Sequence, residues 1–112
     1  MLNELIDLLS LILATETSVF KGEKEEKYAV LTPMMDRFQL YVNDSPGFYA
    51  EEVKVSLFVQ GNYLETKNQI INLLLKNGFD ITEMKYVGLE GDTGYHHYSI
   101  NTEKTYERME EI

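Results

Sequence analysis

The sequence predicts an α+β fold, in which a single domain spanning residues 1–112 packs two helices against an antiparallel sheet. The expected order is helix, strands, helix and β-hairpin. Three observations support it. Apolar residues recur at helical spacing in two separate segments, they alternate with a period of two in the segments between and after them, and the chain has the length of one hydrophobic core.

Composition and charge narrow the class of function. The chain is 44% hydrophobic and 12% aromatic, as in an ordinary folded protein, and its formal net charge is −9. Nucleic acid requires a basic surface to meet its phosphates, so we expect no nucleic-acid partner. The sequence has no Cys, which excludes disulfides, thiol nucleophiles and thiolate metal sites.

The first segment predicts an amphipathic helix over Leu2–Ala14. Glu4 and Asp7 interrupt its apolar run, which is also too short to span a bilayer, so we expect a cytosolic product without a membrane segment. Leu8 and Leu11 widen the apolar stripe beyond one face, which suits a helix packed on two sides or against a partner. Of these two alternatives, a buried core helix is favoured over an interface helix. The stripe itself consists of Leu2, Leu5, Ile6, Leu9, Ile12 and Leu13.

The middle of the chain changes to a period of two. A charged segment without apolar residues, Lys21–Lys27, is expected to be a mobile loop. Tyr28–Thr32 predicts a short strand that Pro33 interrupts, and Arg37–Val42 predicts the next strand. The residues of Asn43–Gly47 are turn formers, so a turn is expected there.

Glu51–Gln60 gives the clearest strand pattern of the chain. Phe58 lies on the polar face of this strand. It must therefore either meet a side chain of a neighbouring strand or lie exposed, and the sequence leaves both possibilities open. The apolar face consists of Val53, Val55, Leu57 and Val59.

The second helix is predicted by its end signals as well as its period. Asn62 is a suitable N-cap, and Glu65 follows at the spacing of a capping box. Gly78 stands where a left-handed residue ends a helix, and Phe79 is placed to pack back on it, as in a Schellman motif. The expected core stripe consists of Leu64, Ile71, Leu74 and Leu75, with Ile70 beside it.

The C-terminal part predicts a β-hairpin, with strands in Asp80–Glu90 and Tyr95–Tyr106 joined across Gly91–Gly94. The acidic tail 107–112 is expected to fray. Pairing Glu90 with Tyr95 places Leu89 near His96, Val87 near Tyr98 and Lys85 near Ile100. His96, Tyr98 and Ile100 then face the core, while Tyr95, His97 and Ser99, with Tyr86 across the ladder, form an outer strip suited to a protein interface.

Asp92-Thr93-Gly94 is the triplet that aspartic proteases use to present a catalytic carboxylate. A retroviral-type half-enzyme needs a flap and a second hydrophobic-glycine segment downstream, whereas only 18 residues follow Gly94. The triplet also follows Glu90-Gly91 rather than the apolar strand that would raise carboxyl pKa values in a dry site. We therefore predict no catalytic residues.

His96 and His97 are the two histidines of the chain. Adjacent side chains on a strand point to opposite faces, so both cannot bind one ion without distortion. A metal-assisted hydrolase that combines Asp92 with a single His is the weakest alternative. We predict no metal and no cofactor.

The stretch Phe48–Tyr106 resembles the small tail-completion, or head–tail joining, proteins of tailed phages and prophages of Gram-positive bacteria. The resemblance covers roughly half of the chain, and its most specific pieces are "SLFVQGNY", "YVGLEGDTGYHHY" and "EKTY". It implies an α+β structural subunit of the virion, made in the host cytoplasm, which assembles, often as a hexameric ring, where the tail tube meets the capsid connector. No catalytic residues come with it.

An assembling subunit needs contact surfaces, and we expect them in the loop Lys21–Lys27, the turn Asn43–Phe48 and the hairpin tip Gly91–Tyr95. The alternative function is an acidic intracellular protein-binding or inhibitor module. The candidate interface residues are Phe48, Tyr49, Tyr86, Asp92, Thr93, Tyr95 and His97.

Overall fold

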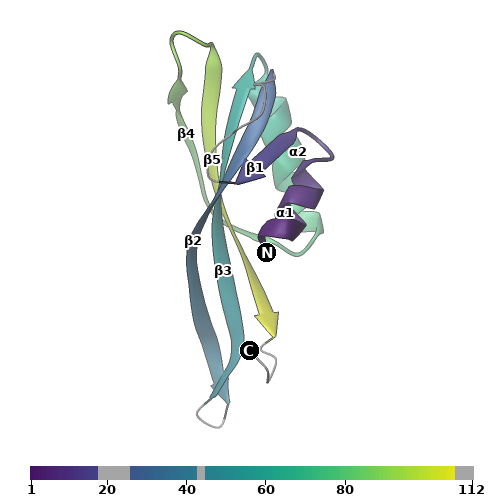
Figure 1. Cartoon of the computed structure of the whole chain (residues 1–112), viewed down its shortest axis with the longest axis vertical. Helices are drawn as coiled ribbons and strands as arrows, with labels where there is room; N and C mark the ends of the chain where they lie inside the picture. The colour runs from purple at the N-terminus through teal and green to yellow at the C-terminus, as the bar shows by residue number, and fades with distance from the viewer. Residues whose placement is uncertain (18–25, 43–44, 108–112) are drawn as a thin grey trace.

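The computed structural model places five strands in one sheet and both helices on one face of it (Figure 1). It describes residues 1–17, 26–42 and 45–107, and the side chains of all of these except 37–48 and 107. The predicted α+β class with two helices is confirmed. The elements are α1 (Leu2–Leu9), β1 (Ala14–Thr17), β2 (Lys27–Val42), β3 (Ser45–Gln60), α2 (Tyr63–Lys76), β4 (Asp80–Leu89) and β5 (Tyr95–Glu107).

The sheet is mixed, and the prediction of a purely antiparallel sheet was wrong. Its strand order is β1-β2-β3-β5-β4, with antiparallel pairing throughout except between β1 and β2, which run parallel. The strand β1 also makes the element order differ from the predicted one. The first helix ends at Leu9 rather than Ala14, and Ala14–Thr17 is extended. The two Thr residues of β1 are β-branched and favour a strand, but a segment of four residues is too short to show the alternation of apolar and polar residues that predicts one.

The two strands predicted on either side of Pro33 are one strand, β2. Its register with β3 shifts between Pro33 and Met35, which is a β-bulge. Proline is tolerated there because β1 covers only Tyr28–Leu31 of the outer side of β2, so the missing N–H of Pro33 faces no neighbouring strand. The predicted turn is also shorter than expected, since β3 begins at Ser45 and Val42 pairs with it; residues 43–44 lie outside the described residues.

The hydrophobic core lies between the helices and one face of the sheet. From α1 and the turn after it, the core receives Leu5, Leu9 and Leu13. From α2 it receives Ile70 and Leu74. The predicted stripe of α2 was partly wrong, because Leu64 and Leu75 are exposed. The face that meets the sheet advances by four residues at a time, through Thr66, Ile70 and Leu74, and the two leucines lie on its flanks. The sheet contributes Ala29, Leu31, Val53, Val55, Leu57, Val59, Tyr98 and Ile100.

Both predicted ends of α2 are confirmed. The Asn62 carboxamide oxygen accepts a hydrogen bond from the Glu65 N–H at 3.2 Å. Gly78 has a φ of +82°, and the Phe79 N–H donates to the Leu74 carbonyl at 3.0 Å, as a Schellman motif requires. Phe79 is buried behind this turn, which fixes the path of the chain into β4.

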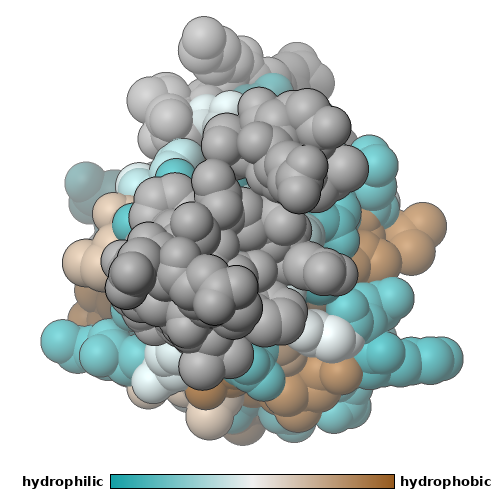
Figure 2. Space-filling view, turned by 90° about the horizontal axis from the view of Figure 1, so that it is seen from below, coloured by the Kyte–Doolittle hydropathy of each residue, from teal (hydrophilic) through white to brown (hydrophobic). Residues whose placement is uncertain are grey.

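The molecule is elongated because β2 and β3 extend far beyond the helices. It measures 55 × 24 × 22 Å, and the lower half of Figure 1 is formed mainly by these two strands. We call this projection, Asp36–Val42 paired with Ser45–Glu51, the arm. Figure 2 looks along the molecule from the arm end, where brown apolar and teal polar surfaces alternate around the rim. None of the helices in the described residues is long and apolar enough to cross a membrane.

Candidate protein-interaction site

The hairpin turn between β4 and β5 forms as predicted. The Glu90 N–H donates to the Tyr95 carbonyl at 2.8 Å, and the Gly94 N–H donates to the Glu90 carbonyl at 2.9 Å. Thr93 donates from its hydroxyl to the Glu90 carboxylate, and the Gln60 carboxamide donates to the Thr93 carbonyl at 2.7 Å. Asp92 and Thr93 are exposed at this tip. The turn is therefore bonded to the end of β3, and the Asp92 carboxylate faces solvent.

The predicted pairing of β4 with β5 holds at the turn and fails two residues later. Leu89 pairs with His96 as expected, but a bulge at Val87 makes Tyr86, rather than Val87, the partner of Tyr98. A shift of one residue moves every following side chain to the other face of the sheet. Tyr86 therefore lies on the helix side, and its predicted place in the outer strip was wrong.

An aromatic cluster on the helix side contains Tyr86. The Tyr86 hydroxyl is hydrogen-bonded to His96 Nδ1 at 2.9 Å, and the Tyr86 ring lies 5.1 Å from the ring of Tyr63 at the start of α2. The rings of Tyr63 and His96 are 4.8 Å apart, and the Lys67 ammonium lies 5.3 Å from the centre of the Tyr98 ring. The predicted inward direction of His96 and Tyr98 is thus confirmed.

A second aromatic cluster lies on the face of the sheet away from the helices. Phe58 stacks on Tyr28 at 4.9 Å and on His97 at 4.4 Å, which settles the question that the sequence left open for Phe58. Tyr28 also meets Tyr95 edge-on at 5.3 Å. Tyr95 lies on the outer face as predicted, but it is only 5% exposed because neighbouring side chains cover it. These neighbouring rings cover one another across three strands.

His97 lies on the outer face as predicted, but it is half-buried. Its Nε2 atom is buried and has no hydrogen-bond partner among the described residues. Burial is the main cause that lowers the pKa of the imidazole below its usual 6.5, and the charge of Lys54 lowers it further. His97 is therefore held neutral as a packed ring.

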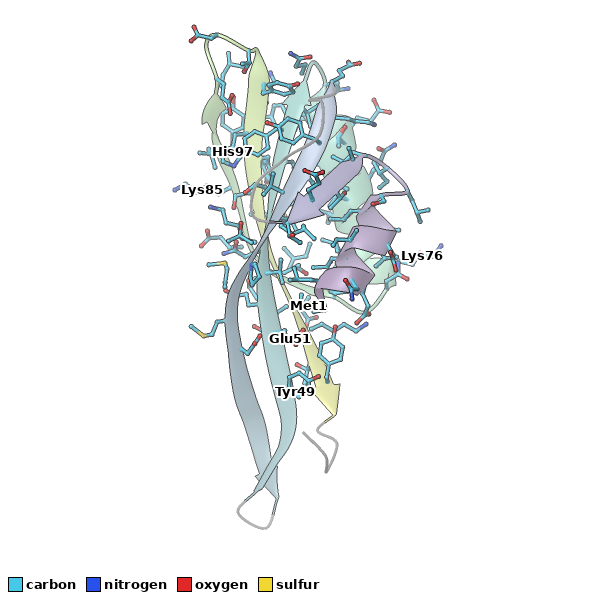
Figure 3. The ribbon with its side chains drawn as sticks, in the orientation of Figure 1. Met1, Tyr49, Glu51, Lys76, Lys85 and His97 are labelled. Atoms are coloured by element: carbon cyan, nitrogen blue, oxygen red, sulfur yellow. The ribbon has the colours of Figure 1, made fainter. Side chains whose placement is uncertain are left out.

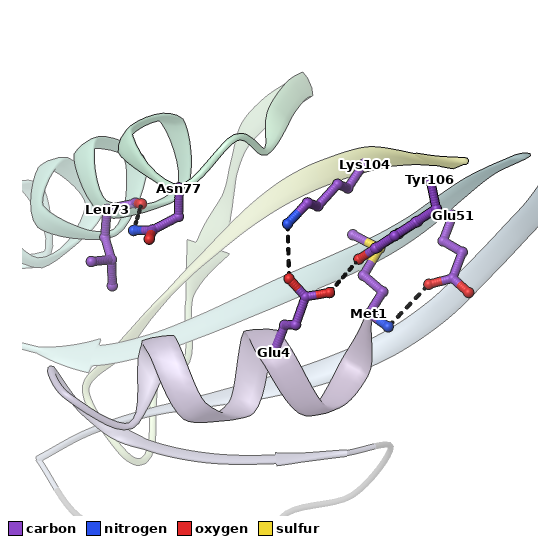
Figure 4. A network of polar contacts seen from close by, with 7 residues as sticks. All are labelled: Met1, Glu4, Glu51, Leu73, Asn77, Lys104 and Tyr106. Atoms are coloured by element: carbon purple, nitrogen blue, oxygen red, sulfur yellow. Dashed lines mark hydrogen bonds and ion pairs between the residues drawn. The ribbon is translucent and has the colours of Figure 1, made fainter. Parts of the chain in front are cut away.

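At the base of the arm a polar cluster joins α1 to β5 (Figure 4). The Glu4 carboxylate accepts hydrogen bonds from Lys104 Nζ at 2.8 Å and from the Tyr106 hydroxyl at 2.7 Å, and these bonds lower its pKa. Burial and the bond to Glu4 raise the pKa of Tyr106 well above its usual range. Tyr49 stacks on Tyr106 at 5.4 Å. Sequence analysis missed this cluster, because nothing local links residues about a hundred positions apart.

An acidic groove lies beside this cluster, where the start of α1 meets the base of the arm. The Met1 amino group is 3.1 Å from the Glu51 carboxylate, as Figures 3 and 4 show. The groove has a volume of about 370 Å³, and its carboxylates come from Asp36, Glu51 and Glu52. No group of three or more His, Asp or Glu side chains in the described part of the chain is arranged to hold a metal ion.

The edge strand β4 carries exposed apolar side chains, of which sequence analysis singled out Tyr86 alone. Met84, Tyr86, Val87 and Leu89 are 41–58% exposed and lie within six residues. We call these four residues the β4 patch. An exposed apolar edge strand is a common site of protein association. The available signal was the apolar content of a strand at the edge of the sheet, but the sequence does not reveal which strand is at the edge.

The seven candidate interface residues do not form one site. Tyr49 lies at the arm and His97 pairs with Phe58, nine residues further along β3, which is roughly 30 Å at about 3.3 Å per residue. Asp92 and Thr93 are at the opposite end of the molecule from the arm, and Tyr86 is on the edge (Figure 1). The side chain of Phe48 lies outside those described, as do most of the loop Lys21–Lys27 and the tail 108–112.

Comparison with known protein families and with curated proteins finds no match for this chain.

Proposed function

We propose that the protein is a structural subunit that works through contacts with other proteins, in the head–tail junction of a tailed phage or prophage. In this role it completes the tail, joins it to the capsid connector and assembles with further copies as a ring. The observation that carries the assembly role is the projecting arm. The phage assignment rests on the resemblance of Phe48–Tyr106 to tail-completion proteins.

The arm supports an assembly role because, among the described residues, its end beyond Phe48 consists of β2 and β3 alone. A two-stranded ribbon alone in water is marginally stable and gains from pairing with further strands or from packing. Beyond Leu31 the outer side of β2 has no strand partner among the described residues, and β5 accompanies β3 only as far as Phe48. A partner that adds to the outer side of β2 would complete this ribbon, which is a frequent mode of protein recognition.

Ring assembly requires a heterologous contact, in which one surface of a subunit meets a different surface of the next. The arm and the β4 side of the sheet are suitable as two unlike surfaces, since they lie at different ends and edges of the molecule (Figure 1). The partners in this role are the tail-tube and connector proteins. Localisation is to the virion, after synthesis in the host cytoplasm.

The second candidate function is an acidic binding or inhibitor module. The net charge of −9 and the groove lined by Asp36, Glu51 and Glu52 favour it, because such surfaces attract basic partners over long range. This function would use the groove rather than the end of the arm, so the two candidates can be separated by removing the end of the arm and keeping Asp36, Glu51 and Glu52.

The test is restoration of joining between filled heads and tails that lack this gene product. We would compare the full chain with a variant in which an Asn-Gly turn replaces residues 40–47, so that Gln39 and Phe48 close a shorter hairpin. The full chain should restore infectious particles, and the short-arm variant should not, although it keeps both helices and the core. A matched control, Lys76→Glu on the exposed end of α2, should restore joining fully.

Two outcomes would contradict the proposal. Failure of the full chain to restore joining would remove the phage assignment. Equal restoration by the short-arm variant would show that the arm is not the contact that matters.

A further inference from the structure

The strand β4 ends the described sheet, with β5 on one side and no strand on the other. An edge strand of this kind presents a row of backbone N–H and C=O groups that can pair with another strand. Its ten residues, Asp80–Leu89, include the whole β4 patch, which leaves apolar side chains in water beside this row. Both features are satisfied at once if a second strand adds to the edge.

We propose that the second strand is β4 of another copy of this chain, paired antiparallel about a two-fold axis that passes beside Met84. In this register Met84 faces its own counterpart, and Glu83 of each copy faces Lys85 of the other. The two sheets then form one continuous ten-stranded sheet. The kind of contact is isologous, with the same residues used by both copies.

The register follows from the alternation of side chains and from charge. In an antiparallel pair, residues directly opposite one another point to the same face, so a two-fold axis must fall at a residue rather than between two. An axis at Glu83 or at Lys85 would place like charges opposite each other, which is destabilising. The axis at Met84 is the one that brings Glu83 opposite Lys85, and it does so twice.

The positions of these charges in the monomer suit this contact. Glu83 and Lys85 pair with Asn101 and Ser99 of β5, so both lie on the face of the sheet away from the helices. Both are exposed, and neither forms an ion pair within the described part of the chain. Figure 3 shows Lys85 projecting away from the sheet on the side opposite Lys76 and α2.

The net charge of the chain favours a self-contact in which opposite charges face each other. Two copies that each carry −9 repel one another, so a self-contact must be neutral where the chains touch. Each of the two Glu83–Lys85 pairs joins one negative and one positive side chain, so the charges cancel where the strands touch. The contact is therefore compatible with an acidic protein.

The bulges limit the length of the contact. Register shifts on either side of Glu83–Tyr86 leave this short segment as the regular part of β4. Because the pairing is short, we expect a weak dimer with a dissociation constant of about 1–100 μM. The contact is two-fold and uses the same β4 edge that a heterologous ring contact would use, so one copy can make only one of the two contacts at a time. The two-fold contact does not depend on the phage assignment.

The test is a charge exchange measured by sedimentation equilibrium of the full chain over a range of concentrations that spans the expected constant. Lys85→Glu and Glu83→Lys each create two like-charge pairs across the axis and should weaken dimerisation roughly 10- to 100-fold. The double variant, Glu83→Lys with Lys85→Glu, restores opposite charges and should dimerise as the wild type does. Lys76→Glu changes net charge as Lys85→Glu does, at an exposed site remote from β4, and should leave the constant unchanged.

The design distinguishes a second copy from any other occupant of the edge, since a foreign strand would not be rescued by a reciprocal exchange. A wild-type chain that stays monomeric throughout the range overturns the proposal. So does a single exchange that leaves the dimer intact, or a double exchange that fails to restore it. Circular dichroism of each variant shows that the monomer is folded, so that loss of the dimer is not loss of the fold.

Discussion

Replacing Glu4 with Gln should destabilise the protein at neutral pH and have little effect in acid. Glu4 is the one carboxylate of α1 that reaches β5, where it accepts the hydrogen bonds from Lys104 and Tyr106 at 2.8 and 2.7 Å. Gln keeps the size of the side chain and can still accept from Tyr106. It carries no charge, however, and so loses the attraction to the Lys104 ammonium.

The magnitude follows from the exposure of the pair. A hydrogen bond to a charged group contributes about 1.5–3 kcal/mol when it is buried, and an exposed ion pair contributes about 0.2–1 kcal/mol. The side chain of Glu4 is 43% exposed and that of Lys104 is 25% exposed, so a value between these limits applies. We expect Glu4→Gln to lower the free energy of unfolding by about 1 kcal/mol, which is about 4 °C in Tm for a chain of this size.

The pH dependence of the stability difference shows whether the Glu4 charge is its cause. The pKa of Glu4 lies below its ordinary value of 4.5 in the folded state, so its contribution is fully present above pH 4.5 and is lost as the pH falls through the lower folded value. Urea denaturation followed by circular dichroism should separate wild type and Glu4→Gln at pH 7. The two curves should converge toward pH 3.

The matched control is Asp7→Asn, which removes an exposed carboxylate from the same helix and should change stability by less than about 0.5 kcal/mol. The reasoning would be refuted if Glu4→Gln were as stable as wild type at pH 7. It would also fail if the deficit were the same at pH 3, because the loss would then come from packing rather than from charge. A double-mutant cycle with Tyr106→Phe should show coupling between the two sites.

Three further substitutions test local features. Gly94→Ala should lower the free energy of unfolding by about 1–2 kcal/mol, because Gly94 has a φ of +75°. Gly91→Ala in the same turn should be nearly neutral, and equal melting temperatures of the two variants would contradict this. Asn62→Ala should cost about 1 kcal/mol by removing the cap of α2, measured by urea denaturation, with no change if the 3.2 Å bond contributes nothing. His97→Phe should keep the stack on Phe58 and remove an unpaired polar atom. Because burial lowers the folded pKa of His97, wild type loses stability as the pH falls below 6.5, so the variant should gain more at pH 5 than at pH 7.5.

The features that the sequence predicted correctly are those that depend on neighbouring residues. The cap at Asn62, the left-handed Gly78 and the turn from Glu90 to Tyr95 are each decided within a few positions of the chain. The alternation in β3 was equally clear, because one of its faces is buried under both helices. Local chemistry was sufficient for these elements.

The features that the sequence did not predict depend on contacts between distant parts of the chain. The parallel strand β1 is extended because it can pair with β2, and its four residues have no pattern of their own. The hydrogen bonds of Glu4 join the first helix to the last strand across about a hundred residues. Nothing in α1 distinguishes Glu4 from Asp7 until the fold brings Tyr106 beside it.

The candidate interface shows how one residue can reverse a prediction about a surface. The pairing at Leu89 and His96 was correct, and every side chain beyond it would have followed if the strand were regular. The bulge at Val87 instead turns Tyr86 toward Tyr63 and His96, and it places both Glu83 and Lys85 on the face away from the helices. A bulge leaves no clear mark in an apolar stretch, because either neighbour can be the extra residue. The same bulge decides that Glu83 and Lys85 lie on the outer face and Met84 on the helix side, so the faces used in the proposed two-fold contact were set by a feature that the residue pattern alone does not encode.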